Sequence, residues 1–226
     1  MNDYFTAFHT IREIDFELHP LKAMWWKNKS SLIVSDLHVG KAAHFRKNGI
    51  AIHTNANKNN YWNLSSLLDH YRPERLLIIG DLSHSSSNSE WDSFVDFRKM
   101  YNEMNWVLVD GNHDVLSTVD YELAGIDTLS ELIEGELRFV HDNTYQDNSK
   151  SDLYTLSGHI HPAIRLVGSA RQRIRLDCFY FNDREGILPA FGEFTGRKVL
   201  KPKKEDQVYA IAENKVIQIP TSKLSR

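Results

Sequence analysis

The sequence has very little cysteine and no long apolar run. Its 226 residues include a single cysteine, Cys178. One thiol cannot form an internal disulfide or a zinc site built from several cysteines, which agrees with a reducing compartment. The longest apolar runs are short segments such as residues 76–79, far below the ~18 residues that a membrane helix needs, and the first residues lack a basic, apolar leader. We therefore expect a cytoplasmic protein with no membrane anchor.

The chain also lacks a strong net charge. It has 27 Lys and Arg against 30 Asp and Glu, a formal charge of −3, and 41% of its residues are hydrophobic. This composition excludes a disordered, collagen-like or coiled-coil chain. The charge is uneven, because residues 165–226 carry 13 basic and 7 acidic side chains whereas residues 1–164 carry 14 and 23. The basic third indicates either an anionic partner or the solvated face of a surface sheet.

Apolar residues recur in two patterns. Short apolar runs predict buried strands at residues 31–35, 76–79, 106–109 and 137–140. Between them, apolar residues spaced by three or four predict amphipathic helices over residues 61–71 and 91–104. Alternating strands and helices indicate a largely parallel sheet, and strand-like runs after about residue 137 predict a second sheet packed on the first. Since no linker or repeat divides the chain, we expect an α/β or α+β protein with one domain over residues 1–226.

Asp, Asn and His follow the predicted strands, where ligand sites of parallel sheets lie. The motifs are Asp36-Leu37-His38, Gly80-Asp81, Gly111-Asn112-His113-Asp114, His141 and Gly158-His159-Ile160-His161. In an extended segment, residues two apart face the same side, so each Asp-x-His or His-x-His pair is predicted to present two ligands to one point. Carboxylate, amide and imidazole ligands without thiolate suit Mn²⁺, Fe or Zn²⁺. Each motif alone is commonly turn chemistry, but five in this order predict a metal centre.

These five motifs together resemble the pattern of the calcineurin-like metallophosphoesterase superfamily. Four further segments are similar to the bacterial ligase-associated DNA-damage-response endonucleases of that superfamily: Ser35–Arg46, Arg72–Leu76, Asn88–Trp91 and Leu188–Gly196. The resemblance implies a four-layer αββα sandwich, in which two mixed β-sheets are flanked by helices. It also implies a hydrolase acting on phosphoric ester bonds with two divalent metal ions, Mn²⁺ being favoured and Fe, Zn²⁺ and Mg²⁺ being alternatives.

The resemblance assigns a role to each motif residue. It implies that one ion is held by Asp36, His38 and His161. It implies that the other is held by Asn112, His141 and His159, with Asp81 bridging the two. A hydroxide between the ions would attack phosphorus. His113 would protonate the leaving group, for which an imidazole pKa of ~6.5 is suitable, and Asp114 would orient its ring.

Several further cations are candidates for substrate binding. His84, His44 and Arg46 are predicted to contact the substrate phosphate; the alternatives are a solvated loop histidine for His84 and a structural ion pair at a helix start for Arg46. Arg171, Arg173 and Arg175 alternate along a predicted strand and place three guanidinium groups on one face. That face is either a track for a DNA backbone or an ordinary solvated surface.

The motifs favour one function over two others. The leading prediction is a DNA endonuclease or phosphodiesterase in DNA repair, associated with a DNA ligase and a helicase as the family resemblance implies. A second hypothesis keeps the site but changes the substrate to a small phosphodiester or pyrophosphate, such as a cyclic nucleotide or a lipid-linked precursor. A third, a non-catalytic interaction scaffold, is disfavoured because no ligand and no catalytic histidine is missing. The motifs do not distinguish phosphodiesters from phosphomonoesters.

Overall fold

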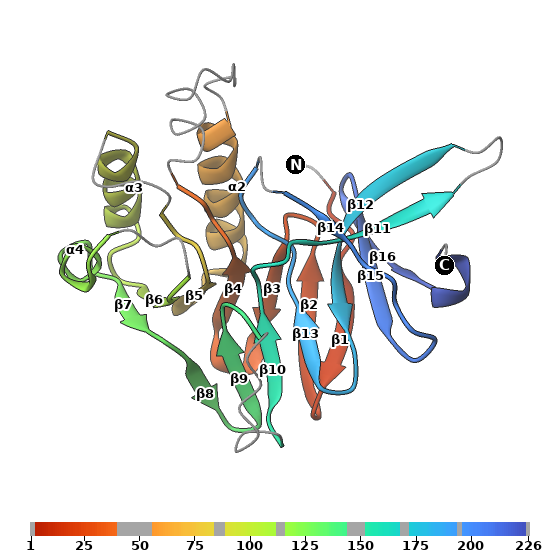
Figure 1. Ribbon diagram of the computed structural model, residues 1–226. Coiled ribbons are helices and arrows are strands. Elements are labelled where there is room, and N and C mark those ends of the chain that lie inside the picture. The colour runs from red at the N-terminus through yellow and green to blue at the C-terminus, as the bar shows by residue number, and fades with distance from the viewer. Residues whose placement is uncertain are drawn as a thin grey trace.

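Two mixed β-sheets form most of the protein (Figure 1). The computed structural model describes residues 3–39, 56–83, 89–111, 116–143, 152–167, 172–193 and 196–224. The first sheet has the order β1 (Ala7–Ile11), β2 (Ile14–His19), β3 (Ala23–Trp26), β4 (Ser31–Ser35), β5 (Arg75–Ile79), β6 (Asn105–Val109) and β7 (Asp127–Leu129). The strands from β4 to β7 are parallel, as the sequence predicts, whereas those from β1 to β4 form antiparallel pairs.

The second sheet is built from the C-terminal half. Its order is β14 (Lys198–Val199), β11 (Pro162–Val167), β12 (Arg173–Phe181), β13 (Glu185–Ile187), β10 (Tyr154–Ser157), β9 (Leu137–Val140) and β8 (Leu132–Glu134). The long strand β12 also pairs with β15 (Gln207–Ala212), which pairs in turn with β16 (Lys215–Ile219). The parallel pairing of β9 with β10 brings the ends of both strands to the same edge.

The α-helices that the structure describes pack on the outer face of the first sheet. They are α2 (Ala56–Tyr71), α3 (Ser89–Lys99) and α4 (Thr118–Leu123), with short 3₁₀ turns at Lys27–Lys29 and Thr221–Lys223. Leu64 and Phe94 from the helices share one buried cluster with Leu32, Ile78 and Trp106 from the strands. The apolar period over residues 61–71 lies within α2. The period over residues 91–104 is helical only to Lys99; the residues that follow form tight turns, which still bury Met104.

A second buried cluster fills the space between the two sheets. It joins Ile33, Leu77 and Val109 of the first sheet to Phe139 and Leu156 of the second. Strands β4 and β5 are buried on both faces, so residues 32–34 and 76–79 are continuously apolar and do not alternate. Because both halves of the chain contribute to one core, the packing agrees with the prediction of one domain, which stays a prediction.

Two buried histidines in the first sheet predict how stability depends on pH. His9 stacks on Phe181 with ring centroids 3.9 Å apart, and burial lowers its pKa from 6.5 to about 4. Burial, aided by the nearby His70, lowers the pKa of His19 to about 4 as well. Between pH 6.5 and 4 these two histidines therefore bind more protons in the unfolded chain than in the folded chain. Their contribution to the free energy of unfolding is expected to fall as the pH decreases through this range, by about 1 to 3 kcal/mol for each histidine.

Urea unfolding of the wild type and of His9→Gln at pH 7.5 and pH 5 measures this effect. The variant removes one titrating group, so the difference in stability between the two pH values should shrink. The exposed His70 provides a control, since His70→Gln should keep most of the pH dependence. Equal pH dependence in the wild type and His9→Gln would contradict the assignment.

Candidate metal centre

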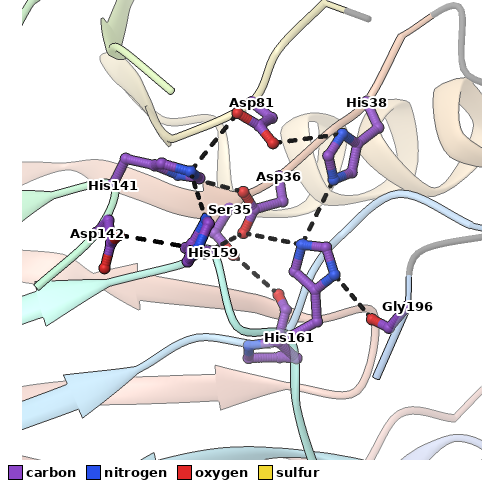
Figure 2. Close-up of polar contacts among 10 residues, drawn as sticks. Ser35, Asp36, His38, Asp81, His141, Asp142, His159, His161 and Gly196 are labelled. Atoms are coloured by element: carbon purple, nitrogen blue, oxygen red, sulfur yellow. Dashed lines mark hydrogen bonds and ion pairs between the residues drawn. The ribbon is translucent and has the colours of Figure 1, made fainter. Parts of the chain in front are cut away.

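Ligand-type side chains from both sheets meet where the strands end (Figure 2). Asp36 and His38 follow β4, and Asp81 follows β5. In the second sheet, His141 follows β9, and His159 and His161 follow β10. The described part of the sequence-predicted site is thus brought together at one edge, as expected for the carboxyl ends of parallel strands.

These side chains form two groups that share Asp36. The ligand atoms of Asp36, His38 and His161 lie within 4.8 Å of one another, and so do those of Asp36, Asp81 and His141. In the first group, His161 Nε2 lies 3.7 Å from Asp36 Oδ2 and 3.4 Å from His38 Nε2. In the second, His141 Nδ1 lies 3.5 Å from Asp36 Oδ1. Each group has the size and the donor types of a site for a small cation.

The carboxylate of Asp81 faces both groups. Its Oδ2 lies 3.9 Å from Nδ1 of His38, and its Oδ1 lies 3.6 Å from Nε2 of His141. Figure 2 shows the side chain between these two rings. This placement agrees with the bridging role that the family resemblance implies for Asp81.

His159 lies beside the second group. Its Nδ1 is 2.9 Å from Nε2 of His141, and its Nε2 is 3.8 Å from Oδ2 of Asp142. Its backbone N–H donates to Oδ2 of Asp36 at 3.0 Å. His159 and His161 are therefore directed to different partners. The prediction that they present two ligands to one point is wrong.

The backbone at the site differs from the extended form that the sequence suggested. Asp36, His38, His159 and His161 have φ angles of 50°, 51°, 65° and 47°, all in the left-handed region. This conformation costs roughly 1–2 kcal/mol per residue for side chains with a Cβ. Such strain clusters at functional sites and persists only where the surrounding structure holds it. Here the hydrogen bond from the His38 N–H to the Asp81 carbonyl, 3.0 Å long, links the loop after β4 to the loop after β5.

Two glycines allow the backbone to approach the buried carboxylate of Asp36. Gly80 has a φ of 87°, and a Cβ there would overlap the ring of His141 and lie 2.7 Å from Oδ1 of Asp36. A Cβ at Gly158 would overlap Oδ2 of Asp36. The positive φ of Gly80 forms a sharp turn, whereas Gly158 allows close packing against Asp36.

The electrostatics of the site favour bound cations. Asp36 is fully buried, and its burial together with the nearby Asp81 raises its pKa to about 7. Its Oδ1 accepts no hydrogen bond from the described residues. A buried carboxylate beside a second carboxylate needs positive charge to remain ionised. The described donors are all carboxylate oxygens and imidazole nitrogens, so the residues fit hard or borderline divalent ions.

Several predicted site residues lie outside the described residues. They are Asn112, His113, Asp114, His84, His44 and Arg46. Two neighbours of the site were not singled out from the sequence as site residues. The carbonyl of Gly196 lies 2.8 Å from Nδ1 of His161, and Asp142 approaches His159. The sequence could have indicated both residues. Gly196 ends the segment that is similar to the endonuclease family, and Asp142 directly follows His141.

Comparison with known proteins identifies the family. The model of the calcineurin-like phosphoesterase family matches residues 30–212. The chain therefore belongs to this family, whose members use divalent metals, and it is a hydrolase acting on phosphoric ester bonds.

One solved structure gives a more particular similarity. The crystal structure of the nuclease MPE of Pseudomonas putida superposes with a TM-score of 0.79 at 26% identity, over 95% of this chain and 100% of that one. It is consistent with the resemblance to the ligase-associated endonucleases. No curated protein matches the chain. Among the described residues, no helix is long and apolar enough to cross a membrane.

The raised pKa of Asp36 predicts how metal binding depends on pH. Below about pH 7 the metal-free carboxyl group is mostly protonated, so a divalent ion must displace that proton. The apparent Kd for Mn²⁺ is expected to rise as the pH falls from 8 to 6. Isothermal titration calorimetry measures this change, and repeating it in buffers of different ionisation enthalpy counts the released protons.

Infrared difference spectroscopy assigns the proton to a residue. At pH 6 the metal-free protein should show a protonated-carboxyl band that disappears when Mn²⁺ is added and is missing from Asp36→Asn. A Kd that does not change between pH 8 and 6, or a band that persists in the variant, would contradict the role of Asp36.

Proposed function

We propose that this protein is a dimetal-dependent phosphodiesterase that cleaves DNA, acting as an endonuclease in DNA repair. The observation that carries the proposal is the pair of ligand groups that share Asp36 and both face Asp81. Membership of the phosphoesterase family and similarity to a nuclease support it. We further propose that residues 1–226 act as one domain in the cytoplasm, and that the protein works with a DNA ligase and a helicase.

The proposed ligands follow from the two groups. The first ion would be held by Asp36, His38 and His161. The second would be held by His141, His159 and Asn112, with Asp81 between the two ions. Mn²⁺ is the proposed metal, and Fe, Zn²⁺ and Mg²⁺ are the alternatives to test. When bound, such a pair of ions supplies a nucleophile at neutral pH and neutralises the oxygens of the reacting phosphate.

We propose that His113 provides the proton that the reaction requires. The alkoxide that leaves a DNA phosphodiester is a strong base, so its departure needs an acid. An imidazolium group can donate at neutral pH, and Asp114 would orient the ring through its other nitrogen. A nitrophenolate leaving group is a much weaker base and depends far less on this proton.

The β11–β12 hairpin supports a polyanionic substrate. It begins at Pro162, directly after His161, and extends beyond the rest of the second sheet (Figure 1). Arg165 and Arg175 are directly opposite each other in the register, and Arg173 lies on the same face. No described carboxylate forms an ion pair with these three arginines. Like charges opposite one another destabilise a sheet, and a bound phosphate would relieve that repulsion.

The arginine pair predicts a selective loss of DNA cleavage. In Arg165→Glu/Arg175→Glu, kcat/KM for a single-stranded oligonucleotide should fall about 10- to 100-fold at low salt, and its salt dependence should become shallower. Hydrolysis of a small phosphodiester dye should not change, because it spans only the metal site. Arg184→Glu, in the exposed turn between β12 and β13, is the matched control. Equal losses on DNA and dye, or undiminished DNA cleavage, would contradict this surface.

Two further variants separate metal binding from proton donation. Asp81→Ala should lose most activity on every substrate of a panel that contains a phosphodiester dye, a phosphomonoester dye, and single- and double-stranded oligonucleotides. His113→Asn should keep bound Mn²⁺ but lose ~10²- to 10⁴-fold in rate on oligonucleotides. It should lose much less on a dye with a nitrophenolate leaving group. Initial rates with Mn²⁺, Mg²⁺ and Zn²⁺ measure both effects.

The same panel decides between the functional hypotheses. A fully active Asp81→Ala protein would contradict the dimetal site. Turnover of small diesters without any cleavage of oligonucleotides would favour a nucleotide or lipid-linked substrate. An inactive wild type would favour a scaffold.

A further inference from the structure

The segment between β13 and β14 runs along the first ligand loop. We call the described residues of this segment together with β14, residues 188–193 and 196–199, the strap. Ala190 forms a parallel bridge with Ser35, and the Phe191 N–H donates to the Ser35 carbonyl at 2.7 Å. The Gly192 N–H donates to the Asp36 carbonyl at 3.0 Å. The strap therefore extends the pairing of β4 into the loop where Asp36 adopts its left-handed conformation.

The other end of the strap holds His161. The carbonyl of Gly196 lies 2.8 Å from Nδ1 of the ring, and the Lys198 N–H donates to the His161 carbonyl at 3.1 Å. An Nδ1–H that donates to this carbonyl leaves Nε2 as the nitrogen with a free lone pair. Nε2 is the atom that faces Asp36 and His38. Figure 2 shows this chain of contacts from Gly196 through His161 to Asp36.

The strap is itself anchored in the fold. The side chain of Phe191 is buried in the cluster between the first sheet and its helices. Asn60 of α2, a buried amide, accepts a hydrogen bond from the Glu193 N–H at 3.4 Å. The strap thus connects the helical layer to a ligand loop of each sheet.

We propose that the strap is a positioning element for the group formed by Asp36, His38 and His161. It fixes the backbone of the first ligand loop at one end and the tautomer and orientation of His161 at the other. Outer contacts of this kind set the affinity of a metal site, typically by 10- to 100-fold. Asp81, His141 and His159 lie on the side of the site away from Gly196 in Figure 2. The strap therefore controls the first of the two ions and has much less effect on the second.

Two glycine substitutions provide a matched test. A Cβ at Gly192 would lie 2.5 Å from the carbonyl oxygen of Leu37 and 3.0 Å from that of Asp36. Both are backbone atoms, so the strap and the ligand loop must separate. A Cβ at Gly135, in the exposed turn between β8 and β9, meets no described atom within 4 Å. Gly192→Ala therefore disturbs the contact between strap and loop, whereas Gly135→Ala adds the same methyl group at the end of β9 opposite to His141.

Equilibrium titration of the full-length protein with Mn²⁺, followed by calorimetry and electron paramagnetic resonance, tests the proposal. The wild type and Gly135→Ala should bind two ions and show the spectrum of a coupled pair. Gly192→Ala should bind one ion about 10- to 100-fold more weakly and show an isolated ion at intermediate Mn²⁺ concentrations. Its circular dichroism and the unfolding midpoint of its metal-free form should change little.

Asn60→Ala keeps the test decisive if Gly192→Ala does not fold. This variant removes the tie between α2 and the strap without adding volume, so it should weaken the same ion in the same direction. Two ions of wild-type affinity in both folded variants, or equal losses in Gly192→Ala and Gly135→Ala, would overturn the proposal. The inference rests on the proposed metal ligands. A wild type that binds no Mn²⁺ would overturn those ligands as well, whereas failure of the variants alone would overturn only the strap.

Discussion

The buried carboxylate of Asp36 is the constraint on which the site depends. An ionised carboxylate with no solvent contact is stable only if positive charge or hydrogen bonds replace water, and the neighbouring Asp81 makes that requirement stronger. The protein surrounds Asp36 with three imidazole rings, the His159 N–H and two glycines that admit the backbone at close range. These contacts hold a buried carboxylate where a bound cation can neutralise it.

The two sheets bring the ligands together by a simple geometric rule. Parallel strands deliver their following loops to one edge, and two sheets packed face to face place two such edges side by side. The apolar cores fix the positions of these two edges relative to each other. The left-handed residues of the loops are stable because the cores and the hydrogen bonds between loops leave the backbone little freedom.

The sequence predicted the elements that depend on local pattern. The strands from β4 to β6, helix α2 and the position of each motif after a strand follow from apolar periodicity and from Gly-Asp or Gly-His pairs. The left-handed conformation of Asp36 and His161 was not predictable, because a two-residue spacing is compatible with both an extended and a curled loop. The contact of Gly196 with His161 joins segments 35 residues apart, and periodicity carries no information about such pairings. The early end of α3 also depends on long-range packing, since the turns that follow α3 still bury Met104 and pack the partly buried Tyr101 against the same cluster.

The long sequence separations at the site have a consequence for synthesis of the protein. The described ligand residues extend from Asp36 to His161, and the strap that contacts these two residues ends in β14 at Val199. Contacts between such distant segments form late in folding, because the intervening chain must first be ordered. A partly synthesised chain has β4 and its ligands but no second sheet to complete them. A nascent hydrolase of this design therefore lacks a complete metal site until the residues through Val199 have left the ribosome.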